Sequence, residues 1–166
     1  MAEISVGLAA PKFQLPADGG GTAALADFAG RIVVLYFYPK DDTKGCTAEA
    51  VDFSGLLPEF ERAGAVVIGV SPDTVARHDR FKARHGLKIV LAADETREVI
   101  EAYGCWGEKM LYGRKYLGVI RSTFLIGRDG RIAAIWRDVR VPNHAQIVLE
   151  AARSLRSGGT LGLRRR

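Results

Sequence analysis

The chain has few cysteines, and they lack the spacings that usually build redox or metal sites. Cys46 and Cys105 are the only two among 166 residues, and they lie far apart. The absence of a C-x-x-C motif argues against a thioredoxin-type dithiol reductase. Paired cysteines and histidines at metal-ligating spacing are also absent, so a zinc site has no support. We therefore expect no metal and no organic cofactor.

Long apolar runs are missing too. No run approaches the roughly 20 residues that a membrane helix needs. The N-terminus, MAEISVGLAAPKF, has no basic segment followed by an apolar core, so no signal peptide is predicted. Without a secretory signal, a structural disulfide is not expected. These absences predict a cytoplasmic protein that makes no membrane contact.

Charge of one sign is in small excess, and the excess is local. The formal net charge is +5, and after Glu150 the chain has five basic residues and no acid: Arg153, Arg156, Arg164, Arg165 and Arg166. The body before them is therefore near neutral. We predict one folded domain over residues 1–156 and a flexible basic tail over 157–166. Because the excess basic charge is confined to the end of the chain after Glu150, nucleic acid is not expected as a partner.

One stretch, VVLYFYPKDDTKGCTAEAVDF, organises the chain. It opens with Val33 to Tyr38, a run apolar on both faces that is typical of a central strand covered on both sides. Pro39 ends the run, since proline cannot donate to a sheet ladder. A polar loop then leads to Cys46, and helix-forming residues follow at once. A thiol in the first turn of a helix is biased toward its thiolate, so the layout predicts a reactive cysteine.

The remaining pattern alternates strands with helices. Strands are predicted at 65–70 and 89–93, and helices at 75–85, 96–103 and 143–156, with a hairpin formed by 119–126 and 131–136. The helix after Cys46 should break at Pro58. Residues 104–118 are predicted as a glycine-rich connection. This order favours an α/β fold with a mixed central sheet flanked by helices.

The motif Pro39-x-x-x-Thr43-x-x-Cys46 resembles the signature of the peroxiredoxins, thiol-dependent peroxidases on a thioredoxin-like fold. The wider string YFYPKDDTKGCTAEAVDF is similar to the Q-type branch, also called bacterioferritin comigratory proteins. Further matches follow in order along the chain: Gly7-x-x-Ala10-Pro11-x-Phe13-x-Leu15-Pro16, Trp106-Gly107-Glu108-Lys109 and Arg121-Ser122-Thr123-Phe124-Leu125-Ile126. The resemblance covers roughly residues 7–152 and implies a thioredoxin-like fold and peroxidase activity.

The resemblance implies specific roles for four residues. Cys46 would attack a peroxide and become a sulfenic acid. Thr43 would hydrogen-bond the thiolate and the peroxide oxygens, although a threonine here also suits a helix cap. Pro39 would shield the sulfur. Arg121 would donate to the thiolate and stabilise charge as the O–O bond breaks, because a guanidinium stays charged and presents fixed donors.

Two further residues are candidates for supporting roles. Glu49 lies one helical turn beyond Cys46, where it would orient Arg121 or remain an exposed helix acid. Gly45 precedes the cysteine at the helix start. The segment Trp106 to Lys109 is expected to be a structural loop. The three histidines, His78, His85 and His144, are predicted at the surface with no general-base role.

The sequence departs from the resembling family at the resolving cysteine. Many Q-type members carry it five residues after the reactive one or in the next helix, where this chain has Val51 and Lys82. Cys105 is then a resolving thiol, an intermolecular partner or a small core residue. The preferred prediction is a one-cysteine cycle, in which thioredoxin, glutaredoxin or a low-molecular-weight thiol reduces the Cys46 sulfenic acid.

Alternatives to that cycle remain open at this point. One is a two-cysteine cycle with Cys105 resolving. Another is a redox-sensing interaction protein that uses the same oxidation as a signal. The substrate class is hydrogen peroxide and organic hydroperoxides in either enzymatic version. A monomer is expected, with a dimer as the alternative.

Overall fold

A five-stranded mixed sheet organises residues 4–156, the part of the chain that the computed structural model describes; the predicted basic tail at 157–166 lies outside it. The strand order is β5-β4-β3-β8-β9, with β3, β4 and β5 parallel and with β8 antiparallel to both β3 and β9. The strands span β3 Ile32–Phe37, β4 Ala65–Ser71, β5 Val90–Ala93, β8 Ser122–Ile126 and β9 Ile132–Arg137. The mixed sheet confirms the predicted fold class.

The central strand β3 separates two cores. All six of its residues are buried. Val33, Leu35 and Phe37 belong to one apolar cluster, whereas Val34 and Tyr36 belong to the other. Successive side chains of a strand point to opposite faces, so a strand apolar throughout is covered on both sides. The predicted strand is confirmed, and each of its ends lies one residue earlier than predicted.

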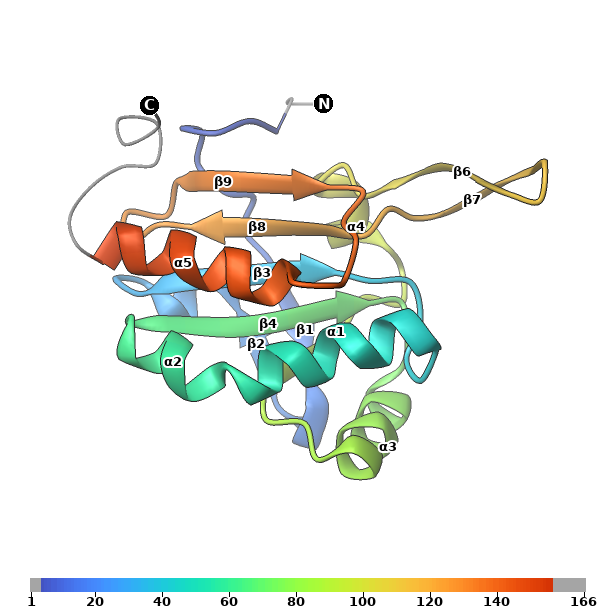
Figure 1. The fold of residues 1–166 in the computed structure, drawn as a ribbon, viewed down its shortest axis with the longest axis horizontal. Coiled ribbons are helices and arrows are strands. Elements are labelled where there is room, and N and C mark those ends of the chain that lie inside the picture. The colour runs from blue at the N-terminus through green and yellow to red at the C-terminus, as the bar shows by residue number, and fades with distance from the viewer. Residues whose placement is uncertain (1–3, 157–166) are drawn as a thin grey trace.

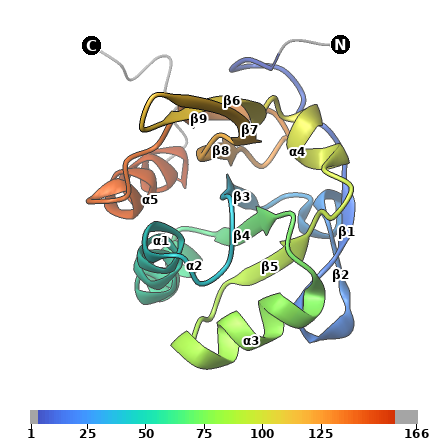
Figure 2. The same ribbon diagram turned by 90° about the vertical axis from the view of Figure 1, so that its right-hand side faces the viewer.

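Helices cover the two faces unequally (Figures 1 and 2). On one face lie α1 Lys44–Gly55, α2 Leu57–Arg62 and α5 His144–Arg156, and on the other lie α4 Glu98–Ala102 and a small hairpin of β1 Gln14–Pro16 and β2 Thr22–Ala24. The short 3₁₀ helices are η1 Asp18–Gly20 and η2 Leu25–Phe28. The helix α3, Val75–His85, lies beside β5 at the edge of the sheet. No helix within residues 4–156 is long and apolar enough to cross a membrane.

The predicted helix break occurs at Leu56, between α1 and α2. Leu56 has φ −96° and ψ 1°, outside helical geometry. Pro58 follows in the first turn of α2. Proline is tolerated there because its missing N–H would have no intrahelical partner. The chain thus ends one helix and begins another at the proline, instead of bending through it.

The prediction of a glycine-rich connection at 104–118, with a structural loop at Trp106 to Lys109, was wrong. These residues form an antiparallel hairpin of β6 Trp106–Leu111 and β7 Arg114–Val119, which extends away from the sheet (Figure 1). Tyr112 and Gly113 at its tip both have positive φ, as a two-residue hairpin turn requires. Its exposed apolar side chains are Met110, Leu111, Tyr112, Tyr116 and Leu117. Because most side chains of the two strands are exposed, the sequence shows no alternation of buried and exposed residues by which they could be predicted.

Candidate active site

Cys46 is delivered from the end of β3 to the first turn of α1. The loop after β3 ends at Thr43, and Cys46 is the third residue of the helix that follows. The first intrahelical bond runs from the Thr47 N–H to the Thr43 carbonyl, so the Cys46 N–H is one of the helix donors without an intrahelical partner. The side chain of Cys46 is buried. Its sulfur therefore lies at the positive end of a helix and away from bulk water.

Arg121 joins the sulfur to a buried carboxylate. It lies in the short link between β7 and β8, and its Nη2 donates to Cys46 Sγ at 3.4 Å. Its Nη1 donates to Glu49 Oε1 at 2.5 Å. Glu49 is 1% exposed, whereas the arginine side chain is 17% exposed. A single guanidinium thus holds a thiol and a carboxylate in a site that is largely closed to water.

The charge of Glu49 depends on pH in the neutral range. Burial raises the pKa of this carboxyl to about 7, although the charge and hydrogen bond of Arg121 act in the opposite direction. Its second oxygen, Oε2, has no hydrogen-bond partner among the described residues. Burial lowers the pKa of Arg121, but Glu49 and Cys46 outweigh it, and the net shift is upward. The arginine stays charged while its partner gains or loses a proton near neutrality.

Gly45 allows this close approach. A Cβ built on it would lie 3.3 Å from Arg121 Nη2, tighter than most real contacts.

Thr43 occupies the N-cap position of α1, and its hydroxyl donates to the Lys40 carbonyl at 2.9 Å. No hydrogen bond between Thr43 and Cys46 occurs in the described part of the chain. Pro39 is half-buried and lies two residues after the end of β3. The structure therefore brings Cys46, Glu49, Gly45 and Arg121 into contact and puts Thr43 and Pro39 in the adjoining loop.

Cys105 lies apart from this group. It belongs to the apolar cluster that contains Phe37, whereas Cys46 belongs to the cluster on the other face of β3. Both thiols are free. The Cys105 thiol donates to the Tyr103 carbonyl at 3.6 Å, and burial raises its pKa to about 11. Of the three roles expected for it, the observed surroundings are those of a small core residue.

The surface prediction was wrong for two histidines. His78 and His144 are buried, whereas His85 is partly exposed and pairs with Asp42. His144 Nε2 hydrogen-bonds Thr123 Oγ1 at 2.8 Å on β8, and burial lowers its pKa to about 4. Helical spacing gave the missed signal. His78 precedes the buried Phe81 by three residues, and His144 precedes the buried Val148 by four.

Comparison with known proteins agrees with the geometry. A family model described as the AhpC/TSA family matches residues 6–135. A putative peroxiredoxin Bcp of Helicobacter pylori is 46% identical over 91% of this chain and 99% of its own length. The peroxiredoxin Bcp of Bacillus subtilis is 44% identical over 92% of this chain and 97% of its own.

A solved structure extends the likeness to three dimensions. The bacterioferritin comigratory protein of Xanthomonas campestris superposes with a TM-score of 0.84 at 40% identity, covering 94% of this chain and 99% of that one. The family model and the relatives each cover most of this chain. The chain therefore belongs to the AhpC/TSA family and, within it, to the peroxiredoxins of the Bcp or Q type, which are thiol-dependent peroxidases.

Proposed function

We propose that this thiol-dependent peroxidase reduces hydrogen peroxide and organic hydroperoxides at Cys46, with Arg121, Thr43 and Pro39 shaping the site and Glu49 and Gly45 supporting it. The observation that carries the proposal is the Arg121 guanidinium, which bonds Cys46 Sγ and Glu49 Oε1 at once. The other thiol, Cys105, also has a guanidinium nearby, but Arg137 Nη1 lies 3.9 Å from its sulfur and that arginine bonds backbone carbonyls in place of a buried carboxylate. The Xanthomonas campestris relative has alkyl peroxide reduction activity, which supports organic hydroperoxides as substrates.

In the first step the Cys46 thiolate attacks one oxygen of the peroxide. A sulfur–oxygen bond forms, the O–O bond breaks, and the sulfur is oxidised to a sulfenic acid while the peroxide is reduced to water or an alcohol. The proton on the attacked oxygen moves to the departing oxygen, which leaves the sulfur as a sulfenate, and a proton from water then gives the sulfenic acid. Negative charge moves from sulfur to that oxygen during the step. A guanidinium beside the sulfur stabilises this charge without rearranging, because Glu49 already holds it in place.

Recycling uses an external thiol in this proposal. That thiol attacks the sulfenic sulfur, releases water and forms a mixed disulfide, which a second thiol reduces back to the Cys46 thiol. Thioredoxin, glutaredoxin or a low-molecular-weight thiol would serve. Cys105 is a poor internal alternative because only about one ten-thousandth of a thiol with a pKa of about 11 is thiolate at pH 7.

A cytoplasmic location fits a cycle that draws on external thiols such as these. The expected monomer is tested by light scattering.

Intact mass after one equivalent of hydrogen peroxide, with dimedone as the sulfenic-acid trap, tests the proposal. Wild type and Cys105→Ser should both gain one trappable oxygen at Cys46, and Cys46→Ser should gain none. If wild type instead loses two hydrogens and Cys105→Ser gains an oxygen, Cys105 resolves and the one-cysteine cycle is wrong. If Cys46 fails to oxidise in either protein, the assignment of Cys46 itself is wrong.

A further inference from the structure

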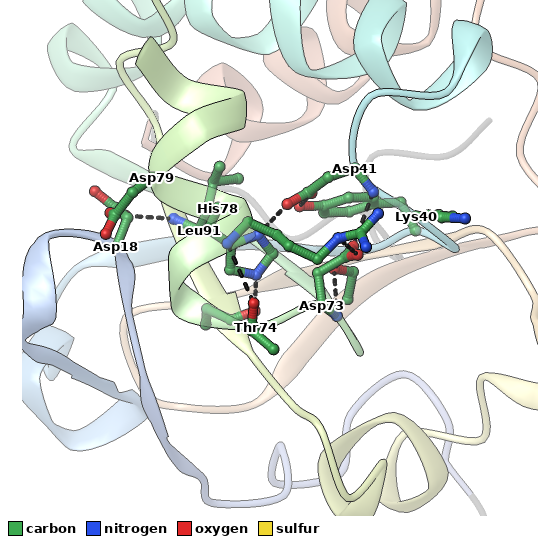
Figure 3. Close-up of polar contacts among 12 residues, drawn as sticks. Asp18, Lys40, Asp41, Asp73, Thr74, His78, Asp79 and Leu91 are labelled. Atoms are coloured by element: carbon green, nitrogen blue, oxygen red, sulfur yellow. Dashed lines mark hydrogen bonds and ion pairs between the residues drawn. The ribbon is translucent and has the colours of Figure 1, made fainter. Parts of the chain in front are cut away.

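A second cluster of buried polar side chains lies behind the loop that precedes Cys46 (Figure 3). It joins Asp41 in that loop to Ser71 at the end of β4, to Asp73 just after that strand and to His78 on α3, and all four are buried. Tyr38, the residue after β3, contacts it as well. The mechanism above uses none of these groups. Burying so many polar atoms is unfavourable unless each is hydrogen-bonded, so their bonds define what the cluster does.

His78 is held at both ring nitrogens. Its Nε2 lies 2.9 Å from the Ala92 carbonyl, which can only accept, so this nitrogen carries a proton. Its Nδ1 lies 2.6 Å from Asp41 Oδ2, while Tyr38 donates its hydroxyl to Asp41 Oδ1 at 2.6 Å. Burial alone lowers the pKa of His78, but the hydrogen bond and the charge of Asp41 outweigh it, and the net shift is upward. The arrangement is that of an imidazolium paired with a carboxylate.

Asp73 fixes the backbone of the same loop residue. Its Oδ2 accepts from the Asp41 N–H at 2.8 Å and from the Ser71 hydroxyl at 2.6 Å, and its Oδ1 accepts from Arg77 Nε at 3.0 Å. Asp41, Asp73 and His78 also lie close enough together to hold a metal ion. Their oxygen and nitrogen atoms are instead engaged with one another, and a guanidinium stands beside them. The cluster is thus a closed hydrogen-bond network, and a cation would have to break it.

The network holds the loop that sets up the first turn of α1. Asp41 is fixed through its side chain and its N–H. The next residue, Asp42, has a φ of 65° and pairs with His85, which lies on α3 like His78. Thr43 then bonds back to the Lys40 carbonyl, closing the loop on itself. Cys46 follows three residues later. The helix α3 therefore braces two consecutive loop residues just before the proposed peroxide site.

We propose that His78, acting through Asp41, is a positioning residue for peroxide reduction: the pair fixes the loop so that Thr43 and the start of α1 present Cys46 to Arg121 and to the peroxide. This inference rests on the proposed role of Cys46. The network touches neither the sulfur nor Arg121 through any bond recorded for residues 4–156. Its effect travels along the loop backbone, where a displacement of about 1 Å at reacting atoms is enough to slow a reaction strongly.

Two substitutions of His78 separate positioning from packing. The amide nitrogen of His78→Asn falls near the place of Nδ1 and can still donate to Asp41. The amide of His78→Gln falls near the place of Nε2, where it reaches Ala92 but not Asp41. Both variants lose one of the two ring contacts and the positive charge at the same buried position. A role in packing alone predicts the reverse order, because asparagine is one methylene shorter than glutamine and leaves the larger cavity.

The measurement is the rate constant for Cys46 oxidation by hydrogen peroxide, alongside the rate of Cys46 alkylation by iodoacetamide, which needs no peroxide geometry. We expect His78→Gln to oxidise about ten- to a hundredfold more slowly than wild type and His78→Asn within about threefold of it, at similar alkylation rates. Arg80→Gln, at an exposed position on the same helix, is the matched control and should behave as wild type.

Equal oxidation rates in the two His78 variants would overturn the proposal, as would a fall in alkylation that matches the fall in oxidation. If neither variant folds, Tyr38→Phe removes only the hydroxyl donated to Asp41. Slower oxidation with unchanged alkylation then supports positioning, and an unchanged oxidation rate refutes it. Failure of Cys46 to oxidise in wild type would count against the proposed function and not against the network.

Discussion

Replacing Arg121 with lysine should slow peroxide reduction while leaving a positive charge in the site. The guanidinium bonds Cys46 and Glu49 with two different nitrogens, at 3.4 and 2.5 Å. Lysine has one nitrogen and cannot serve both partners in that geometry. A hydrogen bond to a charged group contributes about 1.5–3 kcal/mol. Because about 1.4 kcal/mol corresponds to a tenfold change in rate, the oxidation rate constant should fall about ten- to a hundredfold.

Stopped-flow mixing with hydrogen peroxide, quenched with dimedone and read by mass, gives that rate constant directly. Arg137→Lys is the matched control because Arg137, on β9, bonds the Gly104 and Tyr103 carbonyls near Cys105, away from the proposed site. It should oxidise at the wild-type rate. An Arg121→Lys protein that oxidises within about twofold of wild type would refute the argument that the two simultaneous bonds matter.

Three further outcomes are expected. Glu49→Gln should be slower than wild type above neutrality, and the two rates should converge as the pH falls through about 7, because protonated Glu49 then resembles glutamine; a pH-independent ratio would contradict this. Cys105→Ala should leave the oxidation rate constant within about twofold of wild type, measured by the same dimedone assay, since Cys105 lies in the other core. Gly69→Ala should reduce the free energy of unfolding by about 1–3 kcal/mol in denaturant titration, because its Cβ would lie 2.8 Å from the Tyr36 ring; unchanged stability would show that the ring can move aside.

The sequence predicted the parts of the fold that a local pattern encodes. The doubly buried strand at Val33 to Tyr38 was recognisable because both faces are apolar, and α3 was predicted with the bounds that it has, Val75–His85. The β6–β7 hairpin was missed because its side chains are largely exposed and no buried face imposes an alternation on them. A periodic pattern of apolar residues arises only where one face of an element is buried. It therefore does not mark a strand pair that projects from the body of the protein.

The site could be predicted only as far as its residues are marked in the sequence. Cys46 and Thr43 belong to one short motif, and Arg121 stands out as a charge among apolar neighbours. Whether Glu49 is exposed or pairs with Arg121 could not be decided, since the two are 72 positions apart. His78 was misjudged because charged neighbours on α3 conceal that its own side chain faces the interior.

The residues that meet at the Cys46 sulfur are far apart in the sequence, and this has a consequence for biosynthesis. The bond between Arg121 and Cys46 joins residues 75 positions apart, and Arg121 leads directly into β8, which pairs with β3. Such distant pairings form late in folding, since the loop between them must first close. A chain emerging from the ribosome thus exposes its thiol motif well before it has the arginine. It should remain catalytically silent until β8 has joined the sheet, so the recovery of activity reports the pairing of β8 with β3.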